Sequence, residues 1–315
     1  PLVEIQDQYG NPITSGADST RVVTIAIASA NGGNAGSLAL GSTTATAVNG
    51  RATFSNVILS SATINNNYTF NFSAILTVGS RTSSASNAVQ VVHAAADHLT
   101  AATTATGAAA GIAFTRQPVI EVRDVEENVI TDGNKSNAII IASIGTGATL
   151  SGDYAINAVN GVATFTNLLA EGTANSYTLS FATPGLTTVT QSLTLTYGNA
   201  HHLGITTQPV GGHATGAAFT TAPVVKVYDA YDNVVGNSTA SVVATIASGA
   251  GGSLTSATKA AVNGIADFSA LRLVGTPGTA YTLAFASTGL TGATSQSFTV
   301  TYATASQLVL VTQPY

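Results

Sequence analysis

The sequence predicts an all-β protein built from three tandem β-sandwich domains arranged as a rod. Three observations lead to this prediction: one block of sequence recurs three times, apolar residues alternate within each block, and an Asn-Gly pair interrupts every block. Alternation with a period of two places apolar side chains on one face of a strand, and Asn-Gly is a strong signal for a tight turn. We find no stretch with the sustained 3.6-residue period of a helix.

The recurrence is visible at three landmarks in each block. A proline opens an apolar stretch, an Ala-Val-Asn-Gly motif follows, and a Tyr-Thr pair precedes a second alternating stretch. Successive copies of a landmark lie 103 to 117 residues apart, with the difference absorbed in loops. Self-similarity of this kind indicates a repeated structural unit. The landmarks are Pro1, Pro118 and Pro223, then Ala47, Ala158 and Ala261, then Tyr68, Tyr177 and Tyr281.

The proline-led stretch predicts a strand with one buried face. In residues 223–229, Val225 and Val227 share a face while Lys226 points to the other. The Asn-Gly pair that follows in each copy predicts a hairpin, because a type I′ turn needs two residues with positive φ. An aromatic residue comes just after each turn and is predicted to be buried. These residues are Phe54, Phe165 and Phe268.

The Tyr-Thr stretch predicts a later strand, in which Tyr281, Leu283 and Phe285 share a face. About seven short strands in about 105 residues, with turns every eight to twelve residues, are typical of an immunoglobulin-like sandwich. Such folds carry a tyrosine near the start of the sixth strand, two residues before an inward position. Because the sequence has no cysteine, packing replaces a disulfide at that inward position. The residues there are Phe70, Leu179 and Leu283.

Taken together, these stretches resemble the bacterial immunoglobulin-like repeats, akin to the invasin and intimin type, that fill very long secreted surface proteins. The resemblance is carried by AFTTAPVVKVYDAYDNVV, VNGIADFSALRL, YTLAFASTGL and SFTVTY, and it covers essentially all 315 residues. It implies an extracellular stalk, sheath or adhesin shaft at the cell surface. It is specific for architecture and does not indicate a ligand.

We predict four segments along the chain. Residues 1–93 form a first repeat that lacks its first strand, 94–198 a second repeat, 199–303 a third repeat, and 304–315 an extra strand. The linkers are only a few residues long, which predicts stiffly coupled domains. A strand of ten residues spans about 33 Å, so three domains end to end would reach on the order of 100 Å.

The two ends of the sequence are complementary. The second and third repeats begin with a first strand, at residues 98–104 and 202–209, whereas Pro1 lies where the second strand of a repeat begins. Either the chain is a window on a longer protein with further repeats, or the tail of one subunit completes the first domain of the next, as in donor-strand complementation. Both alternatives make the tail an assembly strand. Its apolar residues are Leu308, Val309, Leu310 and Val311.

The composition favours an assembled extracellular material whose partners are copies of itself or adjacent repeats. Only 7% of the residues are charged, against about 25% in typical domains, so charge repulsion between copies is small. Nine Lys and Arg residues are too few for the phosphate contacts of nucleic-acid binding. No apolar run approaches the length of about 20 residues that membrane insertion needs. The alternative function is an adhesin shaft or binding module that recognises glycans or neighbouring cells.

One polar motif, D-x-x-x-N, recurs in every repeat. Two interpretations are open: the paired oxygens hold calcium as a cofactor, or the Asp and Asn side chains bond nearby backbone in a turn. We favour the turn, because the fourth position varies between Gly10, Glu127 and Asp232. The sequence has no thiol and no catalytic motif such as Gly-x-Ser-x-Gly or His-Glu-x-x-His, so no enzyme is predicted. The candidate residues are Asp7, Asn11, Asp124, Asn128, Asp229 and Asn233.

Overall fold

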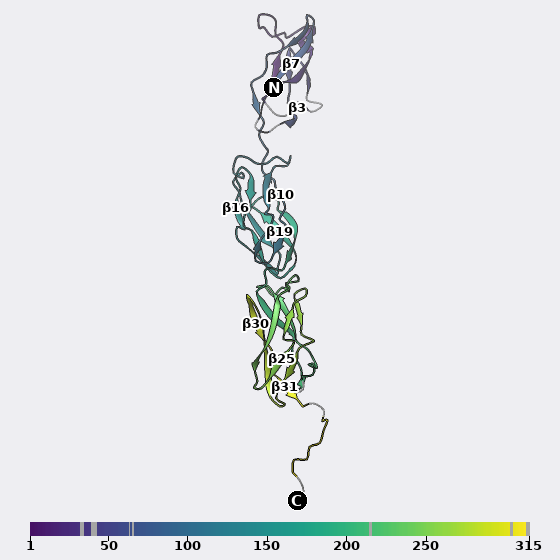
Figure 1. Cartoon of the computed structure of the whole chain (residues 1–315). Helices are drawn as coiled ribbons and strands as arrows, with labels where there is room; N and C mark the ends of the chain where they lie inside the picture. The colour runs from purple at the N-terminus through teal and green to yellow at the C-terminus, as the bar shows by residue number, and fades with distance from the viewer. Residues whose placement is uncertain are drawn as a thin grey trace. The chain divides into compact units, whose positions relative to one another are not determined.

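The protein is all-β, as predicted, in a computed structural model that describes residues 1–31, 35–38, 43–62, 64, 66–213, 216–302 and 305–312 (Figure 1). Within these residues the one helical segment is a 3-10 turn, η1 (Ala17–Thr20). No helix among them is both long enough and apolar enough to cross a membrane. The chain divides into two compact units, Pro1–Asp97 with Arg123–Ile130, and His98–Val122 with Thr131–Tyr315. The rod and the four segment boundaries stay predictions.

The first repeat forms three small sheets. β1 pairs with β5, β3 pairs with β6, and a larger sheet has the order β4-β2-β7-β8, with β9 also paired to β7. The strands are β1 (Leu2–Glu4), β2 (Val22–Ala30), β3 (Ala35–Leu38), β4 (Thr44–Thr46), β5 (Arg51–Thr53), β6 (Leu59–Ala62), β7 (Asn67–Leu76), β8 (Gly79–Thr82) and β9 (Val89–Gln90).

The second repeat places a three-stranded sheet, β10-β13-β17, against an eight-stranded sheet, β15-β18-β12-β11-β20-β19-β14-β16. The strands are β10 (His98–Thr103), β11 (Ala108–Ala109), β12 (Ile112–Ala113), β13 (Val119–Arg123), β14 (Ile139–Ile144), β15 (Ala148–Ser151), β16 (Ala155–Asn157), β17 (Val162–Thr164), β18 (Leu169–Gly172), β19 (Asn175–Ala182) and β20 (Val189–Thr196).

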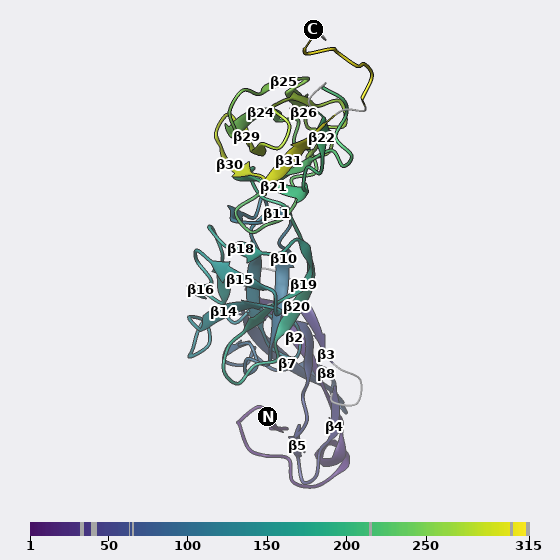
Figure 2. The ribbon, with the colours of Figure 1, turned by 90° about the horizontal axis from the view of Figure 1, so that it is seen from below.

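The third repeat has a continuous path of paired strands, β22-β31-β29-β30-β21-β23-β27, much of which can be followed in Figure 2. β24 pairs with β29 and β26, and β25 pairs with β28. The strands are β21 (His202–Thr207), β22 (Gly212–His213), β23 (Val224–Tyr228), β24 (Ser241–Ser248), β25 (Ser253–Thr255), β26 (Thr258–Ala260), β27 (Ile265–Asp267), β28 (Arg272–Val274), β29 (Ala280–Ser287), β30 (Leu290–Thr294) and β31 (Phe298–Thr301).

The second and third repeats bury the core residues that the alternation predicts, whereas Val3 and Phe72 of the first repeat are half-buried. The aromatic residue after the Asn-Gly turn is buried in all three copies and packs against an aromatic of the later strand, at 5.1 Å between ring centroids for Phe268 and Phe285. The tyrosine of the Tyr-Thr pair is also buried, and in the second and third repeats its hydroxyl donates a hydrogen bond to a backbone carbonyl. Tyr281 donates to the carbonyl of Ala250 at 2.7 Å, and Tyr177 to that of Thr173 at 2.7 Å.

The Asn-Gly turns form, but the hairpin expected around them was wrong in one respect. Both turn residues have positive φ in every copy, for example 51° at Asn263 and 75° at Gly264. Only one bridge closes the turn, between Val262 and Ile265. The flanking strands then enter different pairings, β26 with β24 and β27 with β23. The turn therefore carries the chain across the sandwich, because each flanking strand finds a longer-range partner.

Candidate functional site

The first strand of a repeat has a defined place in the second and third repeats. In the third repeat, β21 runs between β23, its antiparallel neighbour, and β30, which it meets in parallel where His202 faces Thr291. In the second repeat, β10 pairs with β13, and His98 forms a parallel bridge with Thr187. The first strand therefore closes one side of each of these two sandwiches.

The register of β21 directs apolar side chains into the core. Leu203 lies opposite Val227, and Ile205 lies opposite Val225. Leu203 is only 3% exposed and belongs to the core cluster of the repeat. Leu99 of β10 is 4% exposed at the corresponding position. A leucine at this point is therefore part of what completes the sandwich.

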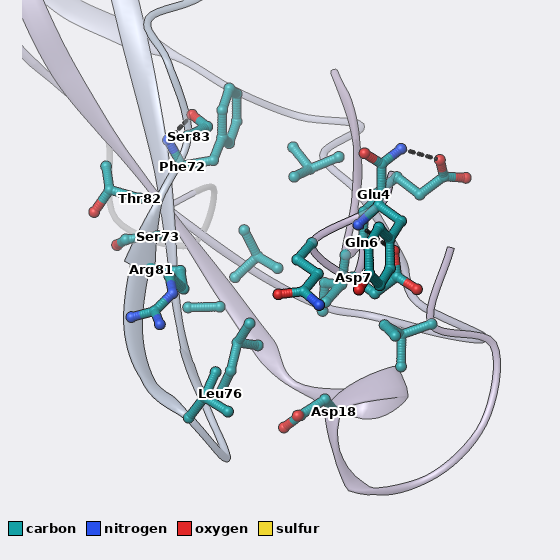
Figure 3. Close-up of a pocket in the computed structure, with 18 residues that line it drawn as sticks. Glu4, Gln6, Asp7, Asp18, Phe72, Ser73, Leu76, Arg81, Thr82 and Ser83 are labelled. Atoms are coloured by element: carbon teal, nitrogen blue, oxygen red, sulfur yellow. Dashed lines mark hydrogen bonds between the residues drawn. The ribbon is translucent and has the colours of Figure 1, made fainter. Parts of the chain in front are cut away.

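A groove occupies this place in the first repeat. Among the described residues β1 pairs only with β5, so its other edge has no strand beside it. The groove has a volume of about 840 Å³ and lies between β1 and the hairpin of β7 and β8. Figure 3 shows Phe72 and Leu76 of β7 on one wall, and Glu4, Gln6 and Asp7 on the other. An unpaired strand edge of this kind is normally covered in proteins.

The walls of the groove are less buried than the same positions of the complete repeats. Val3 is half-buried, whereas its counterparts Ile120 and Val225 are fully buried. Phe72 is half-buried as well, whereas Phe285 is only 1% exposed. The groove therefore leaves in contact with solvent an apolar surface that a first strand covers elsewhere in the same chain.

Four charged side chains line the groove, Glu4, Asp7, Asp18 and Arg81, and the carboxylates among them accept hydrogen bonds while Arg81 donates to the carbonyl of Ser80 (3.0 Å). Glu4 accepts hydrogen bonds from Gln6 Nε2 (2.9 Å) and Arg51 Nε (2.9 Å), and these two bonds lower the pKa of Glu4. Asp18 accepts bonds from the hydroxyl and the backbone N–H of Thr77, which lower its pKa. Because these carboxylates have partners, the groove suits an uncharged apolar segment.

The D-x-x-x-N motifs form one kind of turn. In the first repeat, Oδ1 of Asp7 accepts the N–H of Tyr9 (2.8 Å) and of Asn11 (2.9 Å), and Oδ2 accepts Nδ2 of Asn11 (3.0 Å). Asp124 and Asp229 accept the same set of bonds in the other repeats. In the described part of the chain, no three His, Asp or Glu side chains are grouped as a metal site would require. Calcium binding stays the less favoured alternative.

Two of these turns receive an additional hydrogen bond from the linker that precedes their repeat. The N–H of Ala94 donates to Oδ2 of Asp124 (2.9 Å), and the N–H of Gly198 donates to Oδ2 of Asp229 (2.7 Å). Burial raises the pKa of Asp229, but hydrogen bonds from Gly198 and Asn233 outweigh it and hold the pKa below its usual value. The turn carboxylate thus holds the linker against the sandwich by a hydrogen bond.

The turn of the third repeat also contacts the second repeat. Oδ1 of Asn233 accepts the N–H of Ala174 (2.6 Å), and Nδ2 donates to the carbonyl of Gly172 (3.0 Å). The ring of Tyr231 lies against Gly111, where an added Cβ would come within 2.9 Å of it, and burial raises the pKa of Tyr231. Sequence reasoning missed these contacts.

The residues of the predicted assembly strand lie outside the described strands. Leu308, Val309, Leu310 and Val311 are all exposed. Residues 304 and 313–315 of the predicted segment fall outside the described part of the chain. The assembly role of this segment stays a prediction.

Comparison with protein-family models finds no match, and comparison with curated proteins finds none. Solved structures with similar folds include the Escherichia coli adhesin FdeC, with 19% identity, a TM-score of 0.35, and coverage of 96% of this chain and 91% of that chain. Domains 4–9 of the surface layer protein SbsC match with 16% identity, a TM-score of 0.27, and coverage of 96% and 42%.

A β-glycosidase from Bacteroides vulgatus matches with 10% identity, a TM-score of 0.27, and coverage of 55% of this chain and 21% of that chain. The chain therefore spans about a fifth of the glycosidase and less than half of the SbsC fragment. Likenesses at these identities and TM-scores do not extend to activity, ligand or partner.

Proposed function

We propose that the chain is a structural extracellular module of a filament, sheath or surface array, joined end to end by strand addition at the groove of the first repeat. One observation carries the proposal: the groove opens where β10 and β21 close the other two repeats. In strand addition, main-chain hydrogen bonds supply affinity and pockets for alternate side chains supply specificity. Catalysis has no part in this function.

Residues 305–312 are the segment best suited to the groove. When this segment is aligned on β21, Leu308 takes the position of Leu203 and Leu310 takes that of Ile205. The two segments share the run Gln-Pro after the strand, at 208–209 and 313–314. The tail therefore has the sequence pattern of a first strand.

In this register Leu308 lies opposite Ile5, and Leu310 lies opposite Val3. Full burial of each leucine contributes roughly 1.5 to 3 kcal/mol. Val309 points away from the core, beside Glu4. A slip of one residue would expose both leucines, so the apolar pattern specifies one register.

The strand in the groove comes either from a second copy of the chain or from an adjacent repeat of a longer chain. These two sources supply the same chemistry, an uncharged first strand. They differ in concentration dependence, because only a second copy makes association depend on protein concentration. The low charge of the chain, 7% of residues, favours dense association between copies, lateral as well as end to end.

Sedimentation velocity and electron microscopy of the full chain test this function. The intact chain is expected to form end-to-end oligomers as its concentration rises, and a chain without residues 304–315 is expected to stay monomeric. The pair Leu308→Asp and Leu310→Asp should act like the deletion, because each buries a charge. Val311→Asp is the matched control, since the corresponding Thr206 is exposed. Unchanged oligomers after the deletion would contradict the proposal.

A second function, the shaft of an adhesin, is favoured by exposed tyrosines in loops. Tyr9 is 81% exposed and Tyr154 is also exposed, and flat aromatic faces of this kind can stack on sugar rings. Tyr231, also a loop tyrosine, is half-buried. A glycan array tests this function: a glycan bound by the intact chain should be lost on Tyr9→Ala or Tyr154→Ala. No bound glycan, or binding that both variants retain, argues against it.

A further inference from the structure

One glycine in the first strand of the third repeat is required by the side chain of a neighbour. Gly204 follows the core residue Leu203 in β21, and it does not have the positive φ that favours glycine. A Cβ added at Gly204 would come within 2.6 Å of the ring of Tyr228. Glycine is therefore needed here for close approach and not for its backbone conformation.

The ring of Tyr228 is held over β21. His202 of β21 lies directly opposite Tyr228, and the two rings stack with 5.4 Å between their centroids and 16° between their planes. The ring could make room for a side chain at position 204 only by giving up this stack. Inserting methyl groups into a packed site forces such shifts and is destabilising. The third repeat therefore disfavours a first strand with any side chain at this position.

The second repeat combines the same two positions differently. Arg123 stands just before the turn residue Asp124, as Tyr228 stands just before Asp229. The Arg123 guanidinium donates to the carbonyl of Glu127 in its own turn. In β10 the residue after the core leucine is Thr100, which is half-buried. Where no aromatic ring precedes the turn, the first strand thus carries a branched side chain.

The first repeat resembles the second in this respect. Gln6 stands just before the turn, and its Nε2 donates to Glu4 of β1 (2.9 Å). Glu4 in turn accepts the Nε of Arg51 from β5, the strand that pairs with β1 on the side away from the groove. When the tail is aligned on β21, Val309 takes the position of Gly204. The groove therefore offers a glutamine, tied to its own strand, beside the place of a valine.

We propose that these two positions decide which repeat accepts the tail: Tyr228 excludes Val309 from the third repeat, and Gln6 admits it to the groove of the first. The inference rests on the proposed function, because it concerns the strand that enters this groove. Leu308 and Leu310 match the leucine and isoleucine of β21, so the apolar face of the tail does not distinguish the two repeats.

The distinction serves assembly. Specificity between similar partners is often achieved by a clash with the wrong one. The tail follows directly after the third repeat, where it could displace β21 and close the chain on itself. A clash between Val309 and Tyr228 opposes this exchange. The tail is thereby left to join the first repeat of a second copy.

Two synthetic peptides of residues 305–312 test the inference, one with the natural sequence and one with Val309→Gly. The receptor is the full chain carrying Leu308→Asp and Leu310→Asp, so that its own tail does not compete, and a second receptor adds Gln6→Tyr. Binding is measured by titration calorimetry. The first receptor should bind the natural peptide at least as tightly as the glycine peptide. Gln6→Tyr should weaken binding of the natural peptide by about tenfold or more, because the added ring meets Val309. It should change binding of the glycine peptide by less than about threefold.

Thr53→Tyr is the matched control, because Thr53 is an exposed residue of β5 and does not line the groove. It adds the same ring to the same sheet and should leave both affinities unchanged. Circular dichroism confirms that each receptor is folded. If Gln6→Tyr weakens both peptides equally, or neither, the specificity role is overturned while strand addition stands. If neither peptide binds the first receptor, the proposed function fails and the inference fails with it.

A second measurement tests the excluding ring without any assembly. Gly204→Val in the full chain should lower the hydrogen-exchange protection of the β23 amides by about tenfold or more. In a chain that already carries Tyr228→Gln, the same substitution should change protection by less than about threefold. An equal loss in both backgrounds, or no loss in either, would show that Tyr228 does not exclude a side chain at this position. Either result would overturn the inference even if the peptides bind the groove.

Discussion

The first and third repeats have the same core positions but differ in how completely those positions are covered. In the third repeat β21 lies beside β23, and Val225 and Val227 are fully buried. In the first repeat the edge of β1 faces a groove, and Val3 is half-buried. The difference teaches that the sandwich can form its Asn-Gly turn, its tyrosine position and its aromatic pair without the first strand. The strand adds closure, and for this reason we propose its place in the first repeat as the joint between modules.

The largest expected contrast is between the two leucines that mark the first strand. Leu203→Ala should lower the free energy of unfolding of the third repeat by about 2 to 5 kcal/mol, because it opens a cavity in a packed core. Leu308→Ala, at an exposed position, should change the stability of the dilute chain by less than about 0.5 kcal/mol. Hydrogen exchange of the β29 amides in urea measures both. Equal effects would contradict the comparison.

The next contrast is between the two turn asparagines. Asn233→Ala removes the hydrogen bonds to Ala174 and Gly172 and leaves the buried carboxylate of Asp229 without its Nδ2 donor, so it should cost about 1 to 3 kcal/mol. Asn11→Ala, at the exposed turn of the first repeat, should cost less than about 1 kcal/mol. Urea unfolding followed by hydrogen exchange separates the two repeats. A smaller loss for Asn233→Ala than for Asn11→Ala would show that the joint does not stabilise the third repeat.

A smaller effect is expected from acid. The folded-state pKa of Asp229 lies below its unfolded value of 3.8, because hydrogen bonds from Gly198 and Asn233 outweigh the opposing effect of burial. Its stabilising contribution is therefore complete above pH 3.8 and is lost as the pH falls through the folded pKa. Melting temperatures measured between about pH 5 and pH 2 should fall less steeply for Asp229→Asn than for the parent chain. Equal slopes of melting temperature against pH for the two chains would show that Asp229 does not contribute to the loss of stability in acid.

The smallest effect is expected from a chelator. The carboxylate oxygens of Asp7, Asp124 and Asp229 already accept hydrogen bonds within their turns. Adding EDTA should therefore shift the melting temperature by less than about 1 °C, since a ligand that binds only the folded state would otherwise stabilise it. A sharp fall in the melting temperature that added calcium reverses would support the metal interpretation of all three turns.

Much of the fold could be predicted from the sequence, because its signals are local and repeated. The period of two placed Phe285 and Leu283 in the core, and the positive φ of Asn263 and Gly264 follows from the Asn-Gly pair. The pairing beyond the turn could not be predicted in the same way. β26 and β27 each pair with a strand distant in sequence, and a local turn signal carries no information about such partners.

The candidate site was predictable only in part. The missing first strand, predicted from the ends of the sequence, stays a prediction; the structure shows a groove beside β1, where β10 and β21 lie in the other two repeats. The hydrogen bonds that the Asp-Asn turn of the third repeat makes outside the turn itself were not predicted. Their donors at Gly198 and Ala174 are backbone N–H groups. Every residue except proline carries such a group. No residue type therefore marks the contact, and only coordinates reveal it.

The absence of cysteine from the sequence allows a direct test of the central claim. In the proposed register Val309 of the incoming strand lies opposite Glu4, on the outward face of β1. Cross-strand neighbours lie within the Cα separation that a disulfide accepts. A chain with Glu4→Cys and Val309→Cys should therefore form disulfide-linked dimers and longer ladders under mild oxidation, measured on non-reducing gels. Glu4→Cys with Leu308→Cys, one residue out of register, should link poorly. Equal linking of both pairs, or linking of neither, would contradict the account.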